Sequence, residues 1–190
     1  MKKRCDWAIK TDIEKDYHDN EWGVPLHNDQ KLFEFLILEG AQAGLSWITI
    51  LKKRDAYRVA FDNFDVQKVA QYDDKKIAEL LKNPGIIRNK LKVNATVNNA
   101  KIFIEIQEEF GSFDKYLWSF TDYKTITNPW KKMSDVPVST EISDIMSKDM
   151  KKRGFKFVGT IICYSLMQAV GMVNDHTKGC FRYSEIKKLS

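Results

Sequence analysis

Cysteine and histidine are both scarce in this sequence, which has three of each among its 190 residues. So few cysteines exclude a disulfide-dense secreted scaffold. The sequence also has no apolar run long enough to span a membrane. The first residues, Met1 to Trp7, are basic but lack the apolar stretch of a signal peptide. We therefore expect a cytoplasmic protein with no membrane partner.

Alternation of apolar and polar residues, which is typical of a half-buried strand, is also missing. Hydrophobic residues make up 43% of the chain, as in an ordinary globular protein. Periodicity and capping residues predict helices from about 30 (N-cap Asp29), over 46–60 (N-cap Ser46), after Asp65 and Asp73, over 88–109 and 113–120, from Ser139 or Thr140 to about 152, and over 158–171. The predicted fold class is all-α, with two helical lobes and a ligand cleft between them.

Charge is mildly positive, with a net charge of +5. The excess permits a polyanion partner without proving one. The basic residues gather in three clusters, at 52–54, 88–92 and 151–156, each at the end of a predicted helix. This distribution favours a polyanion partner more strongly than the net charge does.

Four of the cysteines and histidines form two short-spaced pairs, one near each end of the chain. They are Cys5, His18, His176 and Cys180. Two thiolates and two imidazoles form a tetrahedral shell that zinc prefers, and a shared ion would connect the two ends. Two unrelated half-sites and a Cys5–Cys180 disulfide stay open as alternatives. Cys163 lies in an apolar run and His27 in a predicted surface loop, so both are left out of the set.

The Asn-Pro-Gly turn at 83–85 breaks one helix shortly before another opens with basic residues. This is the pattern of a helix–hairpin–helix element. Gly85 would let the backbone approach a ligand, and the free N–H groups of the next helix favour an anion such as a DNA phosphate. Ile87, Arg88 and Lys90 would lie at the same place, where the two cations add attraction without reading sequence. A plain αα-hairpin fits the same pattern.

Glu39 ends an apolar helix, and a loop containing Gly44, Leu45 and Ser46 separates it from Trp47. A buried carboxylate is costly unless it is paired or functional. A solvated glutamate at a helix end is the alternative, and Leu45 is either an exposed wedge or an ordinary core residue.

Aromatic residues alternate with polar ones near the first pair of metal-ligand candidates, at Trp7, Tyr17 and Trp22. A pocket lined by aromatic faces suits a planar heterocycle, particularly a cationic one. An aromatic cluster packed onto the core is the alternative.

Taken together, these segments closely resemble type I 3-methyladenine DNA glycosylase, a bacterial family of repair enzymes that remove alkylated adenine. The matching segments are Arg4-Cys5-x-Trp7, 17–25 (YHDNEWGVP), 38–49 (LEGAQAGLSWIT), 85–88 (GIIR), 151–160 (KKRGFKFVGT) and 173–176 (VNDH). They span nearly the whole chain in order. Segments 9–15 and 109–136 and the tail after Cys180 are less similar, so no functional residue is taken from them.

The resemblance implies a helix–hairpin–helix glycosylase fold. A helical core over 30–170 would contain the hairpin at about 76–100, and a zinc-bearing lobe would be made from 1–28 and 171–190. The four cysteine and histidine candidates would hold one structural Zn²⁺ per chain, since four protein ligands leave no open position for a catalytic water.

The resemblance also implies a role for each residue of the candidate pocket. Glu39 corresponds to the base-recognising, central carboxylate. Tyr17 and Trp47 correspond to aromatics around the excised base, and Trp7 and Trp22 would line the same region. The loop 44–46 would lie against the gap left in the duplex.

The implied reaction is excision of 3-methyladenine from double-stranded alkylated DNA by a monomeric, monofunctional enzyme that leaves an abasic site. The target nucleotide must be flipped out of the stack. Its formal positive charge already weakens the glycosidic bond, so the pocket needs shape, stacking and negative charge more than acid catalysis. Many helix–hairpin–helix glycosylases place an aspartate after the hairpin. Here the residues after 158 are taken as apolar up to Asp175, which adjoins a metal-ligand candidate.

Two rival functions stay open. A non-enzymatic, zinc-containing DNA-binding protein explains the charge pattern but leaves Glu39 and the aromatic residues without a purpose. A glycosylase for another alkylated purine is the closer rival. An RNA-binding module would need a single-strand recognition motif that the sequence lacks.

Overall fold

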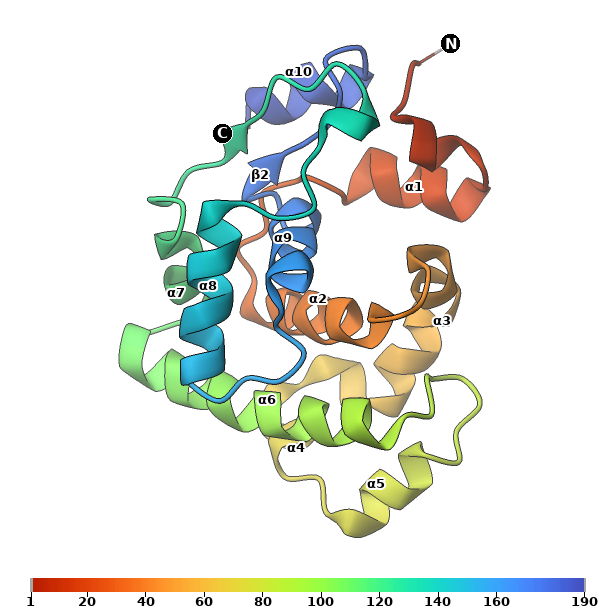
Figure 1. Ribbon diagram of the computed structural model, residues 1–190. Coiled ribbons are helices and arrows are strands. Elements are labelled where there is room, and N and C mark those ends of the chain that lie inside the picture. The colour runs from red at the N-terminus through yellow and green to blue at the C-terminus, as the bar shows by residue number, and fades with distance from the viewer. Residues whose placement is uncertain (1, 190) are drawn as a thin grey trace.

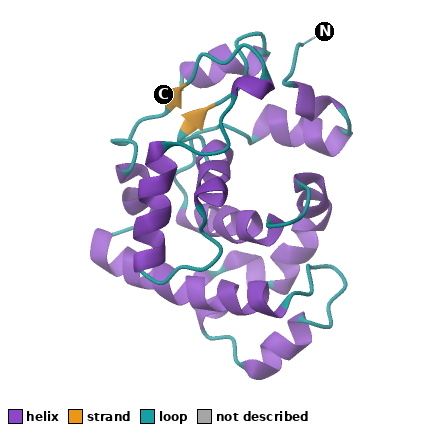
Figure 2. Cartoon of the chain, viewed as in Figure 1, coloured by secondary structure: helices purple, strands orange, loops and turns teal. Residues whose placement is uncertain are grey.

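Helices make up most of the computed structural model, which describes residues 2–189 (Figures 1 and 2). The α-helices are α1 Asp12–Asn20, α2 Asp29–Gln42, α3 Trp47–Ala60, α4 Val66–Ala70, α5 Asp74–Leu80, α6 Lys90–Phe110, α7 Phe113–Ser119, α8 Glu141–Lys152, α9 Thr160–Ala169 and α10 Phe181–Lys187. Three short 3-10 helices are η1 Asp6–Ile9, η2 Asp62–Phe64 and η3 Met133–Asp135. The predicted helical class is confirmed, although α1 and α10 lie where no helix was predicted.

Two short strands depart from the expectation of helices alone. β1 Ile126–Thr127 pairs in parallel with β2 Val173–Asn174. Strands of two residues are too short to show any alternation, so they could not be recognised from the sequence. The pairing continues as Asn128 donates its N–H to the Asn174 carbonyl at 3.2 Å. It holds the otherwise irregular segment 121–137 against the C-terminal part of the chain.

The centre of the fold is α2, which is buried on every side. Its residues from Leu32 to Ala41 are all buried, and it packs against α3, α6, α7 and α9. A helix that is apolar all round belongs inside a core rather than on its surface. Two carboxylates interrupt this apolar helix. Glu34 forms ion pairs with Arg58 and Lys31, whereas Glu39 has no such partner within residues 2–189.

Most predicted helix starts are confirmed. The side chains of Asp65, Asp73 and Thr140 each accept a backbone N–H at the first turn of α4, α5 and α8. Ser46 stands at the N-cap position of α3, but its hydroxyl bonds the Thr49 hydroxyl at 2.8 Å instead of a backbone amide. The long helix α6 begins at Lys90, two residues later than predicted, because Asn89 caps it.

The prediction that Asp29 caps α2 is wrong. Asn28 is the N-cap, since its side chain accepts the Lys31 N–H at 3.0 Å. Asp29 instead accepts the N–H groups of Phe113 and Asp114 at 3.0 and 2.8 Å. A carboxylate fits there because the first turn of α7 presents unpaired amides. It ties the start of α2 to the start of α7.

The two ends of the chain lie together at one end of the molecule, as Figure 1 shows. Phe181 donates its N–H to the Lys3 carbonyl at 2.9 Å. Gly171, with φ of +77°, lies so close to the 24–25 peptide that a Cβ atom there would be 2.4 Å from the carbonyl carbon of Val24. Only glycine combines that backbone angle with that approach. None of the helices within residues 2–189 is long and apolar enough to cross a membrane.

Candidate functional site

A pocket of about 440 Å³ opens where the terminal segments meet α2, α3 and α9. It is lined by Trp7, Lys10, Glu14, Tyr17, Trp22, Glu39, Gln42, Ser46, Trp47, Ile48, Met133, Ser165 and Gln168. The predicted carboxylate and all four predicted aromatic residues are therefore brought together. A volume of this size accommodates a small planar ligand.

Glu39 supplies a buried carboxyl to this pocket. Its side chain is only 4% exposed, and its carboxyl hydrogen-bonds to no residue within 2–189. Burial raises the pKa of Glu39 to about 8. The alternative of a solvated glutamate at a helix end is therefore wrong. A buried carboxyl without a partner is costly to the fold, and such groups cluster at functional sites.

Aromatic rings form the walls around this carboxyl. Tyr17 and Trp47 lie with ring centroids 5.4 Å apart, and Trp7 and Trp22 meet edge to face at 5.1 Å. Burial, followed by the nearby charge of Glu39, raises the pKa of the Tyr17 hydroxyl well above its usual value. Tyr17 therefore stays neutral. The indole Nε1 of Trp47 is buried with no hydrogen-bond partner among the described residues, so it is available as a donor.

The loop between α2 and α3 lies at the rim of the pocket. Gly44, Leu45 and Ser46 are exposed, and Leu45 exposes 41% of its surface. The alternative that Leu45 is a core residue is wrong. Lys92 fixes the start of this loop by donating from Nζ to the carbonyls of Ala41 and Ala43, both at 2.7 Å. An exposed leucine on an anchored loop has the form expected of a wedge.

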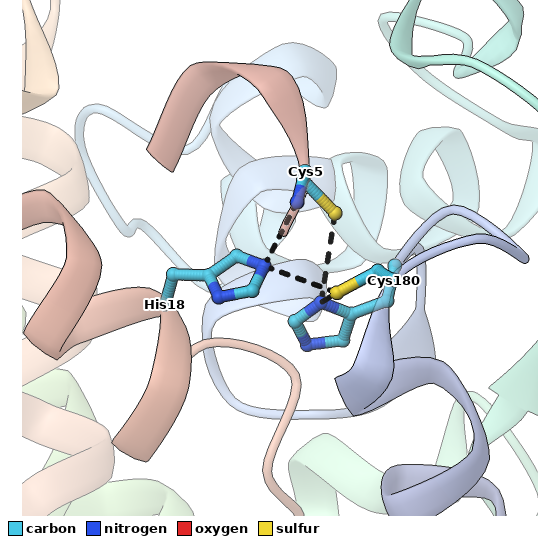
Figure 3. A group of neighbouring side chains, drawn as sticks. Cys5, His18 and Cys180 are labelled. Atoms are coloured by element: carbon cyan, nitrogen blue, oxygen red, sulfur yellow. Dashed lines mark hydrogen bonds between the residues drawn. The ribbon is translucent and has the colours of Figure 1, made fainter. Parts of the chain in front are cut away.

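The four metal-ligand candidates form one buried cluster. One donor atom from each of Cys5, His18, His176 and Cys180 lies within 4.8 Å of the others. Figure 3 shows Cys5, His18 and Cys180, which come from segments far apart in the sequence, turning their donor atoms toward one another. Sγ of Cys180 is 3.4 Å from Nε2 of His18 and 3.6 Å from Nδ1 of His176. Ideal tetrahedral bonds to zinc would separate ligands by roughly 3.5 Å, so the donor set fits such an ion.

The outer nitrogen of each imidazole is held as metal-binding histidines require. Nδ1 of His18 is 2.8 Å from Asp19 Oδ1, and Nε2 of His176 is 3.0 Å from the Trp22 carbonyl. Nε2 of His18 and Nδ1 of His176 therefore face the two sulfurs of the cluster, where an ion would bind. The pKa of Cys180 is lowered, first by a hydrogen bond from Cys5 and then by the imidazoles. The cluster can therefore supply a thiolate.

Both alternatives to a shared site are wrong. The two pairs are not unrelated half-sites, because the fold brings them together. Cys5 and Cys180 are free thiols and form no disulfide. The predictions for the two residues left out of the set are confirmed. Cys163 is buried in the core, and His27 is exposed beside Asp114.

None of the predicted hairpin residues lines the pocket. Gly85, Ile87 and Arg88 lie in the connection 81–89 between α5 and α6, and Lys90 is the first residue of α6. Arg88 and Lys90 are exposed and form no ion pair within residues 2–189. The amides of this connection are largely occupied. Gly85 donates to the Asn83 side chain at 2.8 Å, and Ile87 donates to the Tyr57 hydroxyl at 3.1 Å. Its open N–H groups are therefore fewer than the sequence pattern suggested.

Sequence reasoning missed several pocket residues, of which Ser165 and Gln168 are the clearest. Treating the chain after 158 as apolar was wrong, because both are polar and both line the pocket from α9. Their spacing of three places them on one helix face, and that spacing in an apolar helix was the available signal. Met133 was missed because it comes from the irregular segment before α8.

A helical fold with a buried carboxyl in an aromatic pocket suits a planar ligand that forms hydrogen bonds. The methyladenine glycosylase family model matches residues 7–183. The chain is 47% identical over 181 residues to DNA-3-methyladenine glycosylase 1 of Escherichia coli (strain K12), across 95% of this chain and 97% of that protein. The chain belongs to the methyladenine glycosylase family.

Solved structures agree with the sequence comparison. A crystal structure of 3-methyladenine DNA glycosylase I has a TM-score of 0.92 at 48% identity, and the match covers 94% of this chain and 98% of that one. A tyrosine-to-phenylalanine variant of 3-methyladenine DNA glycosylase I in complex with 3-methyladenine has a TM-score of 0.91 at 38% identity, over 94% of this chain and 96% of that one.

The Glu39 carboxyl makes the stability of the protein depend on pH. In the folded protein the Glu39 carboxyl keeps its proton up to about pH 8, whereas in the unfolded chain it loses the proton near pH 4.5. The free energy of unfolding therefore falls as pH rises through this window. Glu39→Gln cannot lose a proton there, so its free energy of unfolding should not show this fall. From pH 5 to pH 8 the stability of the variant relative to wild type should therefore rise by on the order of 3 kcal/mol. Urea unfolding of both proteins across this range measures the difference.

The matched control is Glu34→Gln, on the same helix. That substitution removes a carboxylate paired with Arg58 and Lys31, so it should lower stability and show no such gain at high pH. Parallel pH profiles for wild type and Glu39→Gln would contradict the burial of an unpaired Glu39.

Proposed function

We propose that this protein excises 3-methyladenine from alkylated double-stranded DNA by hydrolysing the N-glycosidic bond, as a monofunctional glycosylase. The observation that carries the proposal is the Glu39 carboxyl, which is buried without a partner in a pocket walled by Tyr17 and Trp47. Membership of the methyladenine glycosylase family supports the same reaction.

The pocket complements a flipped, cationic base. The π faces of Tyr17 and Trp47 attract a cation by about 1–2 kcal/mol where water is excluded. The Glu39 carboxylate would accept hydrogen bonds from the adenine edge, and such charge-assisted bonds are stronger than neutral ones. A bound cation also favours loss of the Glu39 proton, because opposite charges lower a carboxyl pKa. A neutral purine has no positive charge to attract the π faces or to lower the Glu39 pKa, so both effects favour the alkylated base.

The chemical step needs little from the protein because the lesion is already a good leaving group. Water attacks C1′ as the sugar becomes oxocarbenium-like, and no lysine nucleophile is required. Asp175 is unsuited to stabilise that sugar cation. It is 1% exposed, and its two oxygens accept hydrogen bonds from Asn128, Trp130, Tyr164 and Gln168. Glu39 is therefore the central carboxylate of the proposed site.

Base release from DNA treated with a methylating agent tests the reaction and the role of Glu39 together. Wild type should release 3-methyladenine, resolved by chromatography. Glu39→Gln loses the charged acceptor, so its kcat/KM should fall by about 10- to 150-fold. Glu34→Gln, which makes the same change outside the pocket on α2, should keep activity once stability is allowed for.

The other outcomes separate the rival functions. Release of only 7-methylguanine or hypoxanthine would replace the proposed lesion with another purine. No release from folded protein that binds DNA would favour the non-enzymatic reading. If Glu39→Gln released base as fast as wild type, Glu39 would not be the central carboxylate. A borohydride-trapped DNA adduct would contradict a monofunctional enzyme.

The DNA backbone would be held by basic residues around the pocket rim. Gly85, Ile87, Arg88 and Lys90 form the first anchor, beside the exposed loop of Gly44, Leu45 and Ser46. A second lies between α8 and α9, where Lys151 and Lys156 are exposed and α9 starts after Gly159 with no side-chain cap. Open helix N-termini favour phosphate. Leu45 would occupy the gap left by the flipped nucleotide.

DNA affinity at several salt concentrations tests both anchors. The double variants Arg88→Ala/Lys90→Ala and Lys151→Ala/Lys156→Ala should each weaken binding of any duplex and lower the salt slope by about 2. The control Lys187→Ala/Lys188→Ala removes two exposed lysines at the far end of α10. If the control loses as much DNA affinity as the anchor variants, the effect comes from net charge alone. If an anchor variant loses no affinity, its two residues do not contact the DNA.

We further propose that the buried cysteine–histidine cluster holds one structural Zn²⁺ per chain. Two sulfurs and two imidazoles at tetrahedral spacing suit zinc, and four protein ligands leave no open position for chemistry. The ion would fix Cys5 and His18 against His176 and Cys180. It would also set the position of Trp22, whose carbonyl bonds the His176 ring. Monomeric state and cytoplasmic location stay predictions of the sequence.

Metal content and thermal unfolding test the zinc proposal. Purified wild type should contain about one zinc per chain, and a chelator should lower Tm before it alters base release by the protein that stays folded. Cys5→Ala should lose the metal. Cys163→Ala, which removes a buried thiol outside the cluster, should keep it. Wild type with no zinc, or a Cys5→Ala variant that retains it, would contradict the site.

A further inference from the structure

Asp175 holds the side chain of Gln168 in one orientation. Oδ2 of Asp175 accepts Gln168 Nε2 at 2.8 Å and the Tyr164 hydroxyl at 2.6 Å. Oδ1 accepts Asn128 Nδ2 at 2.7 Å and Trp130 Nε1 at 2.8 Å. The indole N–H can only donate, and an ionised carboxylate can only accept. The Gln168 atom that faces Asp175 is therefore the NH₂ group, and its carbonyl oxygen is turned away.

The carbonyl oxygen of Gln168 is free to act as an acceptor. Oε1 of Gln168 has no hydrogen-bond partner within residues 2–189, yet it is not among the buried atoms left without one. Gln168 lines the same pocket as Glu39 and Trp47. The backbone is also fixed, because the Gln168 carbonyl accepts the Gly23 N–H at 3.0 Å. An immobilised amide in this position presents an acceptor to the pocket.

The chemistry of the lesion supplies a matching donor. In the 3-methyladenine nucleotide, the only N–H groups on the base are the two of the exocyclic amino group, and the positive charge of the base makes them stronger donors. Glu39 can accept one of them and leaves the other without a partner. A base site that pairs each donor rejects analogues that lack it. A 6-oxo purine would instead place its own oxygen against two acceptors.

We propose that Gln168 is a specificity-determining residue of the base pocket, with its Oε1 accepting a hydrogen bond from the exocyclic amino group, an inference that rests on the proposed excision of 3-methyladenine. Asp175 is a positioning residue that fixes which end of the amide faces the base. The segment Asn128 to Trp130 completes the arrangement by supplying two of the four donors to Asp175.

Binding of two free bases tests this role. Tryptophan fluorescence titrations would compare 3-methyladenine with 3-methylpurine, which lacks only the amino group. Gln168→Met keeps the side-chain volume and removes the acceptor. We expect its Kd for 3-methyladenine to rise about five- to tenfold while its Kd for 3-methylpurine stays near the wild-type value. The preference for the amino group should therefore shrink by that factor.

The control variant is Asn128→Leu, which also removes one hydrogen bond from Asp175 but does not line the pocket. It should leave the ratio of the two Kd values unchanged. If Gln168→Met weakens both bases equally, or leaves both unchanged, the proposal is wrong. An equal loss of the ratio in Asn128→Leu would also overturn it. If Gln168→Met does not fold, Gln168→Asn carries the same comparison, because its shorter amide cannot reach both Asp175 and the base.

Discussion

The burial of α2 on every side is the constraint on which the rest of the structure depends. A helix enclosed by α3, α6, α7 and α9 must satisfy each polar group that it carries into the core. Glu34 achieves this through Arg58 and Lys31, and Lys92 satisfies the carbonyls of Ala41 and Ala43 at the helix end. Glu39 alone among the carboxylates of the helix interior is left for a ligand. The same packing that builds the core therefore leaves an unpaired carboxyl facing the pocket.

The two chain ends convert this buried carboxyl into an enclosed site. Trp7, Tyr17 and Trp22 come from the N-terminal segment. The rings of Trp7 and Trp22 contact the imidazoles of the cysteine–histidine cluster. Two connections join the cluster to the pocket wall. One is the bond from His176 to the Trp22 carbonyl, and the other runs from Asp175, the neighbour of His176, to Gln168. Structural support and base recognition thus share the same few residues.

Much of this arrangement was predictable because it depends on residues that are close together in the sequence. Caps such as Asp65, Asp73 and Thr140 act within one helical turn, so the sequence suffices to place them. The ligand set was visible because cysteine and histidine are rare enough here for their spacing to stand out. The pocket residues Glu39, Tyr17 and Trp47 were identified mainly by resemblance to a family, since the local pattern left ordinary alternatives open.

Two of the errors share one physical cause, which is that the partner of a polar group can lie far away in sequence. Asp29 was assigned to its own helix but bonds amides about 85 residues later. Gln168 was passed over in an apolar helix because its meaning depends on Asp175 and on the pocket that it faces.

By itself, the sequence determined the helical class, most helix starts, the four members of the cysteine–histidine cluster and the family. Only the tertiary structure decided that Glu39 is unpaired, that Leu45 is exposed and that the Gln168 amide points one way. Each of these depends on atoms that long-range packing brings together, and hydrogen bonding and burial act over a few ångströms of space whatever the separation along the chain.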